Sequence, residues 1–135
     1  MNSRRHVLAL AGLAAAAALA VTPSSRAMAG ETAPFTDAAF ESAQKGGRPI
    51  LIEVSAPWCP ICKTQKPILA KLSAEPRFKD LQIFEIDFDT AKDLLRRLNV
   101  RMQSTLIAYK GATEVGRSVG ETQPEWIEGL VEKTL

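Results

Sequence analysis

The feature that most constrains the fold of this chain is its cysteine pair, Cys59 and Cys62, the only cysteines among 135 residues. The residues before the pair, 50–54, form an apolar run with β-branched side chains, interrupted only by Glu53, which is typical of a strand buried on both faces. From Cys59 to about Leu72, apolar side chains recur at helical spacing. A cysteine pair at such a junction predicts an α/β fold with both thiols at the N-terminal end of a helix.

The position of each cysteine in that helix predicts its chemistry. Residues at i and i+3 of a helix lie one above the other, so Cys59 and Cys62 can form a disulfide with little movement of the backbone. Free N–H groups and the positive end of the helix dipole lower the pKa of a thiol at the first position below its usual value of about 8.5. We therefore expect Cys59 to be the solvent-accessible nucleophile and Cys62 to be a shielded resolving thiol.

The first 29 residues have the pattern of an export signal. A basic start with paired arginines precedes an apolar stretch over residues 7–21, and Ala-Met-Ala at residues 27–29 is a small-x-small cleavage pattern. The apolar stretch is shorter than the roughly 18 to 20 residues of a membrane-spanning helix. The arginine pair resembles the twin-arginine signal, and an ordinary secretory signal is the alternative. We predict a cleaved signal peptide over residues 1–29, one domain over residues 30–135 and a periplasmic location.

Removal of the signal would change the charge balance and take away the only histidine. The chain has 17 Lys and Arg against 15 Asp and Glu, and Arg4, Arg5 and Arg26 lie in the predicted signal. The remaining near-neutral domain has no electrostatic basis for binding nucleic acid. Without His6, a Ser-His or Cys-His dyad and a histidine-ligated metal are excluded. We expect a soluble domain with no metal site.

The cysteine pair is open to three interpretations at this point: a redox-active disulfide, a structural disulfide or half of a zinc site. Zinc requires four ligands, and the domain has two cysteines and no histidine. A structural bridge that closes so short a loop would constrain the unfolded chain little. The junction of strand and helix and the oxidising compartment favour the redox-active pair.

The rest of the domain alternates between helical and strand patterns. Periodicity predicts the order helix, strand, helix, strand, helix, strand, strand, helix. The predicted ranges are 35–44, 50–54, 59–72, 81–88, 91–98, 105–109, 114–119 and 122–135. Pro67 predicts a kink in the second helix, or its end, and Thr122 with Glu125 matches a capping box at the start of the last helix. This order predicts a central mixed β-sheet flanked by helices on both faces.

The stretch from Pro49 to the C-terminus resembles the thioredoxin family. Four features carry the resemblance: Trp58-Cys59-x-x-Cys62-Lys63, Pro67 five residues after the second cysteine, the acidic Glu53 in the preceding strand, and the late strand-turn-strand ending at Gly120 before a helix. The resemblance implies a thioredoxin-like fold and a thiol:disulfide oxidoreductase. It also implies that no cofactor is needed beyond the Cys59–Cys62 disulfide.

The resemblance assigns roles to the residues around the cysteines. Glu53 takes the place of the family's buried acid, which relays a proton for the second thiol, whereas a strand-edge glutamate that reaches water is the alternative. The residues that the resemblance places in the substrate groove are Trp58, Pro60, Ile61, Ser104 and Thr105.

Ser104 is the clearest departure from the family, because it occupies the position of the family's cis-proline. A cis bond before a non-proline residue costs about 2.5 to 4 kcal/mol, so we expect the Gln103–Ser104 bond to be trans. The Ser104 N–H and hydroxyl could both be aimed at the Cys59 sulfur and stabilise its thiolate. The alternative is a tolerated loss of the proline in a specialised reductase whose partner supplies the missing shape.

The residues between the cysteines, Pro60 and Ile61, indicate the direction of the reaction. They lack the histidine that stabilises the thiolate in strongly oxidising relatives, so we expect a protein that reduces disulfides of partner proteins. Outside the cytoplasm, it would need a membrane thiol electron donor. One alternative is a carrier that holds copper(I) between two thiolates with Met102 nearby, and another is a docking module without catalysis.

Overall fold

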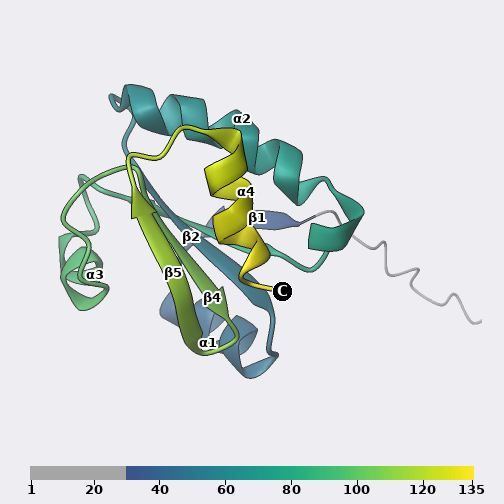
Figure 1. Cartoon of the computed structure of the whole chain (residues 1–135). Helices are drawn as coiled ribbons and strands as arrows, with labels where there is room; N and C mark the ends of the chain where they lie inside the picture. Colours follow the sequence, from purple (N-terminus) through teal and green to yellow (C-terminus); the bar gives the residue numbers. More distant parts are fainter. Residues whose placement is uncertain (1–29) are drawn as a thin grey trace, which may run out of the picture.

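The computed structural model describes residues 30–135, and the predicted signal peptide lies outside this part of the chain (Figure 1). The elements in chain order are β1 (Glu31–Pro34), α1 (Asp37–Lys45), β2 (Pro49–Ser55), α2 (Pro60–Ser73), the short 3-10 helix η1 (Pro76–Phe78), β3 (Gln82–Asp87), α3 (Lys92–Arg97), β4 (Thr105–Lys110), β5 (Thr113–Val119) and α4 (Pro124–Glu132). No helix within residues 30–135 has the length and apolar character needed to cross a bilayer.

The five strands form one mixed sheet with the order β1-β3-β2-β4-β5. Strands β1 and β2 run parallel to β3, and β4 runs antiparallel to both β2 and β5. Strand β2 is therefore central and has neighbours on both sides. Its residues Ile50, Leu51, Ile52 and Val54 are fully buried, which confirms the strand predicted from the apolar run.

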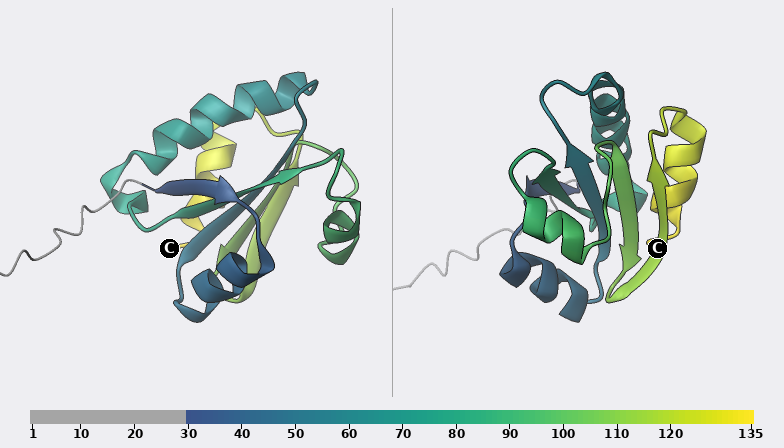
Figure 2. Two further views of the ribbon diagram at one scale, coloured as in Figure 1. Left: turned by 180° about the vertical axis from the view of Figure 1, so that it is seen from behind. Right: turned by 90° about the vertical axis from the view of Figure 1, so that its left-hand side faces the viewer.

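Helices cover both faces of this sheet, as predicted (Figure 2). Because successive side chains of a strand point to opposite faces, Leu51 packs against α2 and α4, whereas Ile50 and Ile52 pack in the cluster that contains α1 and α3. The sheet is thus buried between two apolar clusters. Glu53, two residues after Leu51, lies on the face that α2 covers.

Strand β1 was not among the predicted elements. Residues Glu31–Pro34 pair in parallel with β3 at one edge of the sheet. Three of these four residues are exposed, so the segment has no apolar alternation that could have indicated a strand. Pro34, at the end of the strand, is compatible with an edge position.

Two details of the predicted helices are settled by the structure. Helix α2 continues through Pro67 to Ser73, so the alternative that it ends at the proline is wrong. The capping box at Thr122 is also wrong, because α4 is capped at Gln123 without a side-chain bond. Instead, the Glu121 carboxylate accepts the N–H groups of Thr122 and Gln123, at 2.9 and 2.8 Å, so the acidic residue precedes the helix.

Candidate active site

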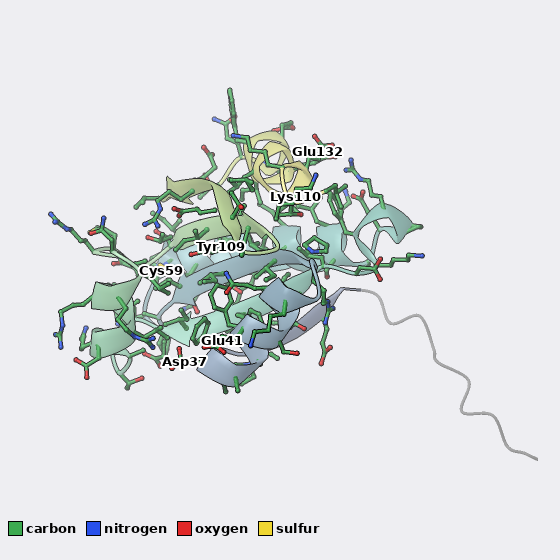
Figure 3. All side chains as sticks on the ribbon, turned by 90° about the horizontal axis from the view of Figure 1, so that it is seen from below. Asp37, Glu41, Cys59, Tyr109, Lys110 and Glu132 are labelled. Carbon is green, nitrogen blue, oxygen red and sulfur yellow. A yellow bond between two sulfur atoms is a disulfide. The ribbon has the colours of Figure 1, made fainter. Side chains whose placement is uncertain are left out.

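The cysteine pair lies where the chain leaves β2 and enters α2. A turn follows β2, in which the Cys59 N–H donates to the Ala56 carbonyl at 3.1 Å. Cys59 is the N-cap of α2 and has extended backbone, and Pro60 occupies the first turn, where its missing N–H costs nothing. Cys59 and Cys62 form a disulfide with their Cα atoms 5.3 Å apart. The pair lies at one end of the molecule, away from Lys110 at the far end of β4 (Figure 3).

The capping position gives Cys59 a different electrostatic environment from Cys62. The Cys59 sulfur accepts the backbone N–H of Cys62 at 3.1 Å. This is the only hydrogen bond to that sulfur among residues 30–135, and no histidine or charged side chain contributes one. The free N–H groups of the first turn favour negative charge at this point. Within the pair, the geometry favours a thiolate on Cys59.

Burial of the cysteines differs from the expectation that Cys59 alone is open to solvent. Cys59 and Cys62 are both only 1% exposed in the disulfide form, so that expectation is wrong. The two residues form a small cluster with Ala56, against which Phe88 packs. Capping position rather than exposure therefore distinguishes Cys59 from Cys62.

Glu53 is a buried acid on the side of the sheet that carries the cysteine helix. Glu53 is only 3% exposed, which excludes the alternative of a strand-edge glutamate that reaches water. The Lys66 amine of α2 lies 3.2 Å from Oε1 and forms an ion pair with it, but the geometry does not meet that of a hydrogen bond. Burial is the main cause that raises the pKa of Glu53; the charge of Lys66 opposes it and that of neighbouring Glu85 adds to it.

Lys66 connects this buried acid to the surface. Its amine also binds the Glu85 carboxylate at 2.8 Å, and about half of each of these two side chains is exposed. Burial lowers the pKa of Lys66, but the bond to Glu85 and the charge of Glu53 outweigh this effect, so its pKa is raised. A cavity of about 470 Å³ lies beside Lys66 and Glu85 and reaches Ser55 and Pro57, just before the cysteines. Lys66 and Glu85 were not singled out from sequence.

The residues predicted to line the substrate groove divide into two groups. Trp58 and Ile61 are 55% and 37% exposed, and Pro60 is exposed as well. The Trp58 indole N–H donates to the Asp89 carboxylate at 2.9 Å, which ties this side chain to the segment between β3 and α3. Ser104 and Thr105, in contrast, are buried.

Two further apolar side chains near Thr105 are exposed. Met102 and Val119 are 51% and 57% exposed and border a cavity of about 290 Å³ together with Thr105 and Arg101. The sequence placed Val119 at the end of a predicted strand but did not indicate it as a site residue, because a strand pattern does not show which side chains stay uncovered. Both side chains offer apolar surface to a partner.

Ser104 does not direct its polar groups to Cys59. The Gln103–Ser104 bond is trans, as predicted, and the chain over residues 30–135 has no cis peptide bond. The Ser104 N–H donates to the Val54 carbonyl at 2.8 Å, and its hydroxyl donates to the Gln103 carbonyl. Both donors are thus used elsewhere, and the idea that they stabilise the Cys59 thiolate is wrong. Ser104 has φ +60°, which proline cannot adopt.

The side chains of residues 30–135 contain no group of three or more His, Cys, Asp or Glu placed to hold a metal ion. The two sulfurs that a copper(I) carrier would use are bonded to each other in this structure. No observation on the described part of the chain favours the carrier over the redox pair.

Comparison with known proteins settles the family. Residues 31–133 match the sequence profile of the Thioredoxin family. The chain belongs to the thioredoxin family. Thioredoxin from Mycobacterium tuberculosis is 34% identical over 90 residues, which are 66% of this chain and 77% of that protein. Thioredoxin from Coprinus comatus is 30% identical over 96 residues, which are 71% of this chain and 90% of that protein.

A solved structure agrees with this assignment. The crystal structure of Trxlp from Edwardsiella tarda is 44% identical and superposes with a TM-score of 0.73, covering 75% of this chain and 98% of that one. The predicted thioredoxin-like fold is confirmed. With a Cys59–Cys62 disulfide at the start of α2, this thioredoxin-family protein is a thiol–disulfide oxidoreductase that acts on protein disulfides.

Proposed function

We propose that this thioredoxin-family protein is an exported reductant of disulfides in partner proteins. Cys59 is the nucleophile, Cys62 is the resolving thiol, and Glu53 is the proton relay. A membrane thiol donor returns the cysteine pair to the dithiol form after each turnover.

The reaction transfers two electrons to the partner. The Cys59 thiolate attacks one sulfur of the partner's disulfide and releases the other sulfur as a thiolate, which leaves a mixed disulfide. Glu53 accepts the proton of Cys62, whose sulfur then attacks Cys59. This step breaks the mixed disulfide, releases the second partner thiolate and forms the Cys59–Cys62 disulfide. The raised pKa of Glu53, which results mainly from burial, suits a carboxylate that must accept a proton near neutral pH.

The single observation that carries the reducing direction is the sparse set of donors at Cys59. Among residues 30–135, its sulfur accepts only the Cys62 N–H, and Pro60 and Ile61 between the cysteines bear no charge. Strong oxidants of this chemistry are strong because their reduced form is stabilised. Here the helix N-terminus stabilises the thiolate, and no histidine or charged side chain of residues 30–135 adds a hydrogen bond to it, so the dithiol gives up its electrons more readily than in such oxidants.

Export is supported by the boundary of the domain. The family match begins at residue 31 and β1 begins at Glu31, so residues 1–29 lie outside the part of the sequence that matches the family. A reductant outside the cytoplasm ends each turnover as a disulfide and has no access to cytoplasmic reductants. Electrons must therefore cross the membrane through a thiol donor, which is the basis for that part of the proposal.

The roles of the cysteines can be tested by trapping the mixed disulfide that the reduced protein forms with a disulfide-bonded substrate. The Cys62→Ser variant should accumulate a covalent complex with a disulfide-bonded protein such as insulin, because the resolving sulfur is absent. The matched Cys59→Ser variant should form little complex, and the unchanged protein should turn over. A complex that forms through Cys62 in the Cys59→Ser variant, at the rate seen with Cys62→Ser, would reverse the assignment.

A further inference from the structure

Gln65 is a polar residue in a position that would normally be apolar. It lies on α2, three residues after Cys62, and none of its surface is exposed. Its amide nitrogen donates to the Ser104 carbonyl at 3.2 Å and to the Glu121 carbonyl at 2.8 Å. The side chain therefore connects the cysteine helix to two other segments, the loop before β4 and the turn after β5.

Within the described part of the chain, the oxygen of the Gln65 amide has no comparable bonds, which makes the two bonds of its nitrogen the reason for a polar residue here. Its Oε1 is buried and has no hydrogen-bond partner within residues 30–135. A buried acceptor without a partner lowers stability, and an apolar side chain of similar volume would avoid this loss. The two N–H bonds to the loops are the feature that an apolar side chain could not provide.

The loop that Gln65 binds is held in an unfavourable conformation. Ser104 has φ +60°, in the left-handed region that non-glycine residues rarely adopt, and it is buried. Such a conformation persists only where the surroundings over-determine it. The Ser104 N–H binds Val54 at 2.8 Å, and its carbonyl accepts the Gly120 N–H at 3.1 Å in addition to the Gln65 amide. Of these bonds, only that of Gln65 comes from the helix that bears the cysteines.

Both segments bound by Gln65 carry the exposed apolar surface beside the site. Met102 precedes Ser104 in its loop, and Val119 precedes the turn at Gly120. A β-carbon placed on Gly120 would lie 4.0 Å from the Ile61 side chain, so this turn is next to the residues between the cysteines. A change in either segment would therefore move surface that a protein partner touches.

We propose that Gln65 is a positioning residue, which fixes the loop at Ser104 and the turn at Glu121 relative to the cysteine helix and thereby sets the affinity for protein disulfides. The inference rests on the proposed reductase function. A small disulfide needs access only to the sulfur of Cys59. A protein disulfide must also fit the two segments, so the loss of Gln65 affects the two substrates differently.

The test compares Gln65→Met with the matched control Gln82→Met in the full chain. Gln82 on β3 is also buried, and its amide nitrogen donates to the Glu31 and Ile83 carbonyls at 3.1 and 3.2 Å, so it matches Gln65 in burial and in its two donated bonds. It differs in location, and its Oε1 accepts a bond from Arg48 at 3.3 Å. Gln65→Met should raise KM for insulin roughly tenfold and leave reduction of hydroxyethyl disulfide within about twofold of the parent. Gln82→Met should leave both reactions unchanged.

A Gln65→Glu variant provides a rescue that depends on pH. A protonated carboxyl group has one O–H to donate to a loop carbonyl, whereas a carboxylate has none and is repelled by both carbonyls. The ratio of the KM of Gln65→Glu for insulin to the KM of the parent, both measured at the same pH, should be near one in acid and should rise with pH. A ratio that does not change with pH would contradict the proposal.

Amide hydrogen exchange separates this inference from the proposed function. Exchange at Ser104 and Gly120 should become faster in Gln65→Met and stay as in the parent in Gln82→Met. If the parent does not reduce insulin, the reductase function is wrong, and exchange still reports on positioning. If Gln65→Met matches Gln82→Met in both KM and exchange, Gln65 does not position the loops and the proposal is overturned.

Discussion

Among the charged residues of the described part of the chain, Glu53 is the most buried, and the proposed chemistry needs its carboxylate. An acid in this place is unfavourable when ionised, because Lys66 provides a charge at 3.2 Å but no directed hydrogen bond. Glu85, its neighbour on β3, adds a second negative charge. The exposed Lys66 and Glu85 place polar groups between Glu53 and the solvent, so the proposed relay has a route for its proton.

Glu53→Gln should stabilise the protein at neutral pH and slow its turnover. Because the pKa of Glu53 is raised in the folded state, the wild-type protein loses stability as pH rises from the unfolded value of 4.5 through the folded value. Glutamine does not ionise, so the variant should gain relative stability over that range. Resolution of the mixed disulfide should slow on the order of a hundredfold.

Urea unfolding at several pH values and rapid-quench kinetics measure these two effects. Lys66 keeps its bond to Glu85 in the Glu53→Gln variant, so the loss of stability from removing the Lys66–Glu53 ion pair should be small. A variant that is less stable than the parent at neutral pH, or that resolves the mixed disulfide equally fast, would show that Glu53 is a packing residue.

Ser104 gives a second prediction, based on its backbone. Ser104→Gly removes the β-carbon from a left-handed residue but also loses the hydroxyl bond to Gln103, so its stability should stay within about 1 kcal/mol of the parent. Ser104→Val places a branched side chain at φ +60° and should lose about 2 kcal/mol or more. Denaturant unfolding compares the two. Equal stability would mean that the loop relaxes to another conformation.

At the scale of elements, α4 packs closely against β5 at a glycine of the strand. A β-carbon on Gly116 would lie 2.9 Å from the Leu130 side chain, which projects from α4. Gly129, one residue earlier on the same helix, has no atom within 4 Å of the place of its β-carbon. Packing therefore requires a glycine at position 116 but not at position 129.

Alanine at these two positions should change stability in opposite directions. Gly116→Ala forces Leu130 to move and should lower the free energy of unfolding by about 1 kcal/mol. Gly129→Ala adds a β-carbon at a partly buried helix position with free space and should raise it by roughly 0.5 to 1 kcal/mol. Thermal unfolding followed by circular dichroism measures both. A gain for Gly116→Ala would mean that the helix lies further from the strand.

The elements that could be predicted from sequence are those with their own periodicity. The apolar run of β2 and the helical spacing of α2 identify themselves, and the order of the elements then predicts the mixed sheet. Strand β1 could not be predicted, because its pairing with β3 depends on the partner and not on its own residues. The start of α4 was misjudged because a glutamate three residues after Thr122 gave the capping pattern, whereas Glu121 makes the bonds.

The site divides in the same way. Cys59, Cys62 and Glu53 could be found because their meaning lies in short spacing and in an acid within an apolar run. Lys66 and Gln65 could not, because each acts through a residue far along the chain: Lys66 through Glu53 and Glu85, and Gln65 through Ser104 and Glu121. The orientation of the Ser104 N–H and hydroxyl was misjudged, because backbone bonds to Val54 and Gly120 fix the conformation of this residue.

For the whole molecule, the proposed location depends on the first 29 residues. When the full chain is produced in a bacterium with a twin-arginine pathway, the periplasmic protein should begin at Gly30. Replacing both Arg4 and Arg5 by lysine should keep the protein in the cytoplasm at its full length, because that pathway reads the arginine pair. Arg26→Lys, a matched change in the same segment, should leave export intact.

Mass spectrometry of the two cell fractions identifies the species. Equal export of the lysine pair would assign the signal to the ordinary secretory route. Full-length protein in the cytoplasm for the unchanged chain would contradict export itself.

The central claim, that the Cys59–Cys62 pair serves as a reductant, is tested most directly by its equilibrium reduction potential at pH 7. The pair is titrated in dithiothreitol or glutathione buffers, and its redox state is read from thiol alkylation. Because the described part of the chain places one N–H donor at the Cys59 sulfur, the potential should lie near that of thioredoxin, about −270 mV. A potential near about −120 mV, as in the strongest oxidants of this chemistry, would contradict the account and make the protein a donor of disulfides.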